Sequence, residues 1–164
     1  MVGDPISDDE AKLTFRDAVL EIKCPCPFYS KDNVLYKYLK KQPWKDVPYY
    51  YVPQIYMQMY QMEKDHAVIV NYTPTCGTKI YTTDFNEHYS DFLLKMIRKF
   101  VRFCLESEVP PNDSFWVDSY PSEYSKFLRD TLAVVESCKE IKFIRPEECN
   151  KILTPYFGSL NMWE

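Results

Sequence analysis

The sequence predicts an α/β fold in which helices flank a central β-sheet. Residues 18–24, 66–72 and 78–83 are short apolar or alternating runs of the length that strands have. Residues 87–106 instead repeat apolar side chains at helical spacing over several turns. The length of 164 residues suits a single domain with its own core.

The N-terminal residues are acidic and turn-rich, with Asp4, Asp8 and Asp9 ahead of a short candidate strand over residues 12–15. A brief polar turn leads from there into the strand over residues 18–24, so the two segments are predicted to form a hairpin.

The strand over residues 18–24 carries a carboxylate and an ammonium group two positions apart. Side chains at i and i+2 leave the same face of a strand, so Glu21 and Lys23 share one face. We expect Leu20 and Ile22 to point the other way, into a core.

Two helices are predicted next. Residues 34–40 form a short basic amphipathic segment that Ser30 or Asp32 could cap. Proline at position 53 suits the first turn of a helix that extends to residue 62. In this second helix three amides fall on one stripe beside the apolar face: Gln54, Gln58 and Gln61.

The strand over residues 66–72 is almost entirely apolar, which predicts a central place in the sheet. The strand over residues 78–83 follows a turn and should pair with it antiparallel. Asn86 is expected to cap the long helix over residues 87–106, and residues 122–138 are expected to form a further helix.

Composition excludes some functions and restricts others. The net charge of −4 gives no global basic field, so a nucleic-acid partner would need a local basic surface. Three glycines and the lack of G-x-G-x-x-G or Walker patterns argue against a glycine-rich phosphate loop. The two densest basic runs are Lys37, Lys40, Lys41 and Lys45, and Lys95, Arg98, Lys99 and Arg102.

The Glu21–Lys23 pair has two interpretations. It is a solvated surface ion pair in an α/β interaction domain, or it belongs to a phosphodiester-cleaving site. Such a site needs carboxylates for Mg²⁺ and a cation near the developing charge. Glu21, an aspartate from the preceding turn and the carbonyl of Ile22 would supply oxygens, and Lys23 the cation.

Three motifs together favour the second interpretation: Leu20-Glu-Ile-Lys-Cys-Pro25, Tyr51-Val-Pro-Gln54 at the head of a helix, and an apolar strand that ends Tyr-Thr-Pro. In these motifs and their order the chain resembles the YqaJ viral recombinase family, the phage-lambda-type exonucleases of the PD-(D/E)xK nuclease superfamily. The resemblance implies a restriction-endonuclease-like mixed sheet, Mg²⁺ or Mn²⁺ as cofactor, and digestion of duplex DNA from its ends. It also implies a homo-oligomer, a trimer in several members.

Carried over to this chain, the resemblance makes Glu21 the metal-binding acid and Lys23 the catalytic lysine. Gln54 and Tyr51 would orient the lysine, the water or a phosphate. The family's upstream acid sits in a Pro-Asp-Gly turn, whereas the order here is Gly-Asp-Pro. Asp4 is the first candidate for that metal ligand, with Asp8 and Asp9 as alternatives.

The resemblance covers residues 1–106, predicted as the nuclease-like core, and leaves 107–164 as a C-terminal helical extension packed on it. Family members carry helices ahead of the acid turn, and we expect a fold that lacks them. The predicted function is Mg²⁺-dependent exonuclease activity in DNA recombination or processing. The alternative is a catalytically impaired nuclease-fold protein that binds DNA or a protein partner.

No apolar run reaches the length of a transmembrane segment. We therefore expect a soluble intracellular protein without a membrane partner, with the nucleus or a viral factory as candidate compartments.

Overall fold

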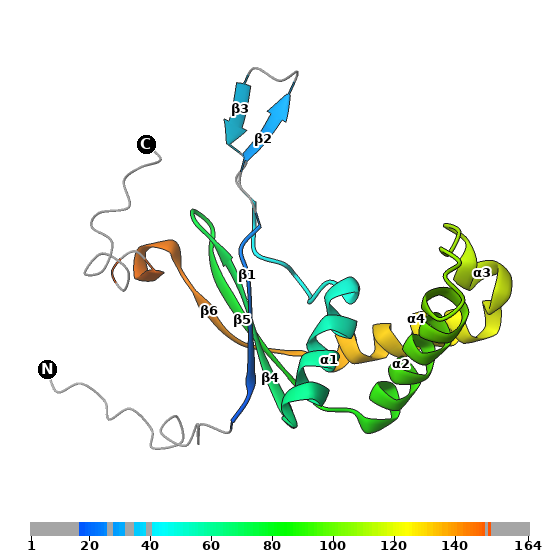
Figure 1. Cartoon of the computed structure of the whole chain (residues 1–164). Helices are drawn as coiled ribbons and strands as arrows, with labels where there is room; N and C mark the ends of the chain where they lie inside the picture. The colour runs from blue at the N-terminus through cyan, green and yellow to red at the C-terminus, as the bar shows by residue number, and fades with distance from the viewer. Residues whose placement is uncertain (1–16, 26–27, 32–34, 39–40, 150, 152–164) are drawn as a thin grey trace, which may run out of the picture.

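A computed structural model describes residues 17–25, 28–31, 35–38, 41–149 and 151, with the backbone alone for 28–31 and 35–38. Its centre is a four-stranded mixed sheet of order β1-β4-β5-β6 (Figure 1). β1 runs parallel to β4, while β4–β5 and β5–β6 are antiparallel. The strands are β1 (Val19–Lys23), β4 (His66–Thr73), β5 (Gly77–Asp84) and β6 (Lys139–Ile144).

The parallel pair β1 and β4 is joined through the helix α1 (Val52–Met62), because parallel neighbours need a crossover. A 3-10 turn, η2 (Tyr49–Tyr51), leads into α1, and proline occupies its first turn as predicted. The helix ends where Glu63 adopts a left-handed conformation, with φ of 53°. Its apolar stripe, Val52, Ile55, Tyr56 and Met59, is buried.

A second helical layer lies beyond α1. Asn86 caps α2 (Glu87–Phe100) by accepting a 3.0 Å hydrogen bond from the backbone N–H of Tyr89, as predicted. The helix continues as a π-helical turn, η3 (Val101–Leu105), and α3 (Phe115–Ser119) and α4 (Pro121–Ser137) follow. The Tyr89 ring meets the Tyr56 ring edge-on at 4.7 Å, which joins this layer to α1.

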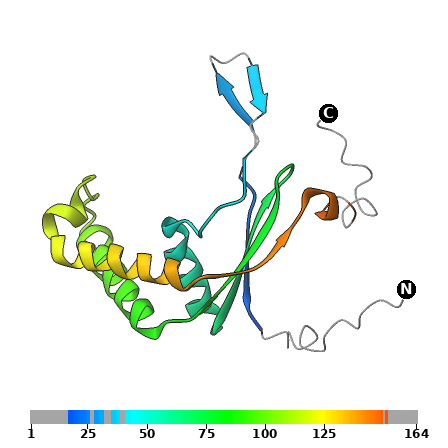
Figure 2. The ribbon, with the colours of Figure 1, turned by 180° about the vertical axis from the view of Figure 1, so that it is seen from behind.

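All four labelled helices lie on one side of the sheet, as the front and back views both show (Figures 1 and 2). The expectation that Leu20 and Ile22 point into a core is therefore wrong. These side chains are 60 % and 56 % exposed, on the face away from α1. The face of β1 that α1 covers carries Val19, which is buried, together with Glu21 and Lys23.

The short helix predicted over residues 34–40 is also wrong. The structure has a two-stranded antiparallel hairpin instead, made of β2 (Phe28–Lys31) and β3 (Leu35–Tyr38), which projects beyond the end of the main sheet (Figure 1). Such a short segment is a poor isolated helix, and its two tyrosines and leucine suit a strand.

The predicted strands over 66–72 and 78–83 are confirmed, and the first lies inside the sheet as expected. The helix over 122–138 is confirmed as α4, in which the apolar side chain of Leu132 is 50 % exposed. The buried residues of this helix are Thr131 and Val134.

Sequence reasoning missed β6, whose side chains are mostly exposed and so give little alternation. Because β6 pairs with β5, the part of the chain predicted as a helical extension also contributes a strand to the sheet. The candidate strand over residues 12–15 and Asp4, Asp8 and Asp9 lie outside the described residues. Among the described helices, none combines the length and apolar character that crossing a membrane requires.

Candidate functional site

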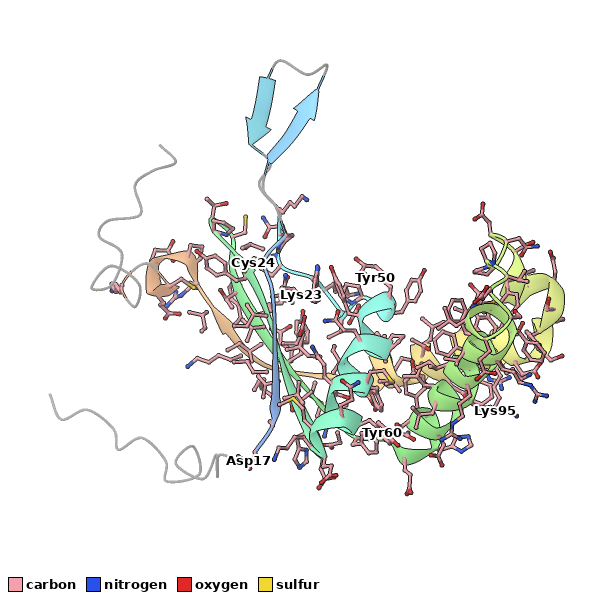
Figure 3. The ribbon with its side chains drawn as sticks, viewed as in Figure 1. Asp17, Lys23, Cys24, Tyr50, Tyr60 and Lys95 are labelled. Carbon is pink, nitrogen blue, oxygen red and sulfur yellow. The ribbon has the colours of Figure 1, made fainter. Side chains whose placement is uncertain are left out.

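Four polar side chains meet in the space between β1 and α1. Glu21 and Lys23 project from the helix-covered face of β1, and Figure 3 shows Lys23 on that side. Gln54 and Gln58 come from α1, one helical turn apart. A strand face and a helix stripe therefore bring together residues more than thirty positions apart in the sequence.

Three of these side chains form a closed ring of interactions. The Lys23 ammonium lies 2.6 Å from Glu21 Oε1 and donates to Gln54 Oε1 at 2.9 Å. Gln54 Nε2 donates to the same Glu21 Oε1 at 3.1 Å. The side chains of Lys23 and Glu21 are only 19 % and 13 % exposed, so this is not a freely solvated surface pair. The single amide of Gln54 fixes both the acid and the cation.

Tyr51 completes the surroundings of the ammonium group. Its ring centroid lies 4.3 Å from Lys23 Nζ, a cation–π contact that holds the charge over the aromatic face. The structure thus brings together all four residues predicted as catalytic: Glu21, Lys23, Gln54 and Tyr51.

Gln58 was noted in the amide stripe but not assigned to the site. Its Nε2 donates to Glu21 Oε2 at 2.9 Å, opposite the oxygen that Lys23 and Gln54 contact. Burial opposes ionisation of Glu21, but hydrogen bonds from Lys23, Gln58 and Gln54 and the charge of Lys23 outweigh it. The pKa of Glu21 therefore lies below its ordinary value. The i, i+4 spacing between Gln54 and Gln58 was the sequence feature that could have assigned Gln58 to the site.

Two oxygen atoms at the site, Glu21 Oε2 and Gln58 Oε1, have acceptor capacity that the described residues do not use. A carboxylate oxygen offers two lone pairs, and Oε1 already has two donors, whereas among described residues Oε2 has one. Gln58 Oε1 is buried and, within the described part of the chain, has no hydrogen-bond partner. Carboxylate and amide oxygens are the ligands that Mg²⁺ and Ca²⁺ take in proteins. These two oxygens fit the edge of a metal site.

The structure says less about the other two predicted metal ligands, the Ile22 carbonyl and Asp4. Ile22 lies between Glu21 and Lys23 on β1, and Asp4 is outside the described residues. Asp17, which is not among the predicted ligands, pairs with Lys64 at 3.2 Å. Within the described residues, no three His, Cys, Asp or Glu side chains gather closely enough to hold a metal.

Asn71 is a second residue that sequence reasoning missed. It is completely buried on β4, where it pairs with Lys23 in the strand register. Its Nδ2 donates to the Lys23 carbonyl at 3.2 Å, and its Oδ1 accepts from the Trp44 backbone N–H at 2.8 Å. The Tyr81 hydroxyl donates to the Trp44 carbonyl at 2.5 Å. The loop that carries Trp44 is thereby fixed beside the end of β1.

The basic runs in the sequence lie in two places. Lys41 lines a cavity beside the site together with Lys23 and Tyr51, while Lys37 and Lys40 fall where side chains are not described. The second run lines a separate pocket on α2 and η3, with Phe103 and Tyr120 among its walls. In that pocket Lys99 is paired with Glu123 at 2.6 Å.

Comparison with protein-family models, with curated proteins and with solved structures finds no match to this chain.

Proposed function

We propose that this protein is a Mg²⁺-dependent deoxyribonuclease with a restriction-endonuclease-like fold, related to the lambda-type exonucleases. The observation that carries the proposal is the position of Gln54, which bonds Lys23 and Glu21 at once. A surface ion pair needs no such amide, whereas a catalytic lysine has to be held next to its acid. The parallel β1–β4 pair with α1 crossing above it supports the proposed fold.

The side chains then have distinct roles. Glu21, kept ionised by its lowered pKa, would offer Oε2 to the metal, and the Gln58 amide oxygen and the Ile22 carbonyl would be the further oxygen ligands. The metal, when bound, supplies charge stabilisation at the phosphate and lowers the pKa of water. Lys23 places a fixed positive charge where the scissile phosphate would develop negative charge. Gln54 and Tyr51 hold that ammonium in position.

The test is hydrolysis of a labelled linear DNA duplex with and without Mg²⁺. Glu21→Gln keeps the shape of the side chain but removes its charge, and Lys23→Met removes the cation. We expect each to lower Mg²⁺-dependent hydrolysis by at least about 100-fold, as loss of a group that stabilises charge does in other enzymes.

Lys79 and Glu140 provide the matched control, because they form a 2.7 Å ion pair across β5 and β6, the two strands farthest from β1 in the sheet order. Glu140→Gln should leave hydrolysis unchanged. Hydrolysis that persists in both Glu21→Gln and Lys23→Met contradicts the proposal. DNA binding by the wild type without any Mg²⁺- or Mn²⁺-dependent turnover would instead support a catalytically impaired binding protein.

A further inference from the structure

A series of aromatic rings extends from the candidate site, and of its members the site uses Tyr51 alone. Four aromatic rings form a row in which each ring contacts the next. Trp44 lies 5.2 Å from Tyr51, Tyr51 lies 4.5 Å from Tyr50, and Tyr50 lies 5.6 Å from Tyr49, all between ring centroids. Lys23 lies over the ring of Tyr51, so the ammonium group of the site contacts this series. We call these four residues the aromatic series.

The outer members of the aromatic series are open to solvent. Tyr50 is 60 % exposed and Tyr49 is 50 % exposed, although both are adjacent to a well-packed helix. Figure 3 shows Tyr50 at the start of α1, on the same end of the helix as Lys23. Exposed aromatic rings at fixed positions cost little conformational entropy when they bind a planar ligand.

Two lysines lie beside the rings of the aromatic series. A cavity of about 450 Å³ is lined by Lys23 and Lys41 together with Trp44, Tyr50 and Tyr51. This volume lies within the range of roughly 300–1,000 Å³ that is usual for ligand sites. Lys41 gives it positive charge despite the net charge of −4 of the chain, whereas the ammonium group of Lys23 is paired with Glu21. The backbone of Trp44 is held by Asn71 and Tyr81, so the inner wall of the cavity is fixed.

We propose that this cavity binds an unpaired nucleotide of a DNA strand, with the base stacked on Tyr50 and a phosphate beside Lys41. Aromatic rings in a positively charged groove are the usual means of binding single-stranded nucleic acid, because every base has a π-face and every linkage a charge. A base inside a duplex has no free face to stack on, so the cavity selects frayed or single-stranded ends. Lys23 lies at both the cavity and the Glu21 site, so a strand held here would lead to that site.

This inference rests on the proposed function only for the idea that the bound DNA strand leads to the Glu21 site. The binding itself can be measured without catalysis. The experiment is fluorescence anisotropy of a labelled oligothymidine with the 164-residue chain in EDTA. It is compared with an oligonucleotide of equal length and charge whose residues are abasic. The variants are Tyr50→Ala, Tyr50→Phe and Tyr60→Ala. Tyr60 is the matched control because it is 48 % exposed near the other end of α1 (Figure 3).

Tyr50→Ala should weaken oligothymidine binding by roughly 5- to 100-fold, the range found for loss of one stacked base. Tyr50→Phe keeps the ring and should stay within about twofold of the wild type, and Tyr60→Ala should have no effect. The abasic strand should bind the wild type more weakly than oligothymidine and should not respond to Tyr50→Ala.

Equal binding of the abasic strand and oligothymidine by the wild type would overturn the proposal, even if a variant failed to fold. So would equal effects of Tyr50→Ala and Tyr60→Ala, or Tyr50-dependent binding of an uncharged proline-rich peptide without oligothymidine binding. If base-dependent binding is found but Mg²⁺ brings no hydrolysis, the nucleotide site stands and the proposed nuclease activity fails.

Discussion

At the scale of single residues, the Glu21 carboxylate is defined by the donors around it. Lys23, Gln54 and Gln58 donate to its two oxygens from opposite sides, and together they favour the ionised form over the protonated one. Because the pKa of Glu21 is lowered, the acid stays charged as the pH falls below its ordinary value of 4.5. Its ion pair with Lys23 is lost only as the pH falls through the lowered pKa.

Gln58→Met removes one of these donors with little change in volume. The pKa of Glu21 should then rise toward its ordinary value, and the acidic limb of the pH–rate profile should move to higher pH. The Mg²⁺ concentration for half-maximal hydrolysis should rise about 10- to 100-fold, as with other residues that orient metal ligands. Mg²⁺ titrations over a range of pH values measure both effects.

Gln61→Met is the control for this substitution, because Gln61 lies on the same helix but is exposed. An unchanged Mg²⁺ requirement and pH profile in Gln58→Met would contradict the assigned role.

Much of the site could be predicted at this scale, and the limits have physical reasons. The i, i+2 rule put Glu21 and Lys23 on one face, and a motif pointed to Gln54 and Tyr51. Asn71 could not be identified in this way, because it sits within an apolar strand and its role depends on a loop 27 residues away. Which face of β1 is covered depends on where the helices pack, and alternation along the strand does not determine that.

At the scale of elements, the three longer helices α1, α2 and α4 could be predicted because their ends and faces are encoded locally. Proline at the start of α1 and Asn86 at the start of α2 each act within one turn. The β2–β3 hairpin and β6 were missed because short, exposed strands depend on pairing partners that the local sequence does not specify. Pairing with other strands determines the structure of these segments.

The cap of α2 gives a prediction for stability. Asn86→Ala removes the side-chain oxygen that accepts from the Tyr89 N–H, and it should lower the free energy of unfolding by about 1 kcal/mol. Urea unfolding followed by circular dichroism measures the change. Asn112→Ala, at an exposed position, should change it by less than about 0.5 kcal/mol. Equal losses in the two variants would show that the cap contributes nothing specific.

At the scale of the whole molecule, the helices on one side of the sheet divide the protein into two unlike faces. One face carries the site between β1 and α1, and the other presents the exposed side chains of Leu20 and Ile22. The chain carries 24 acidic and 20 basic side chains, so its overall field does not attract nucleic acid. Any DNA binding must therefore depend on a few local lysines, and this makes its salt dependence informative.

The salt dependence of oligothymidine binding should accordingly be shallow and should depend on Lys41. Each phosphate contact with a single strand contributes a slope of about −0.7 to a plot of log K against log salt concentration. Lys41→Ala should reduce the slope by about that amount, because Lys41 lines the cavity beside the aromatic series. Lys64→Ala is the matched control, since Lys64 follows α1 at its other end and pairs with Asp17. Binding constants measured at several salt concentrations give the slope for the wild type and for both variants. A slope that Lys64→Ala changes and Lys41→Ala does not would place the DNA elsewhere on the molecule.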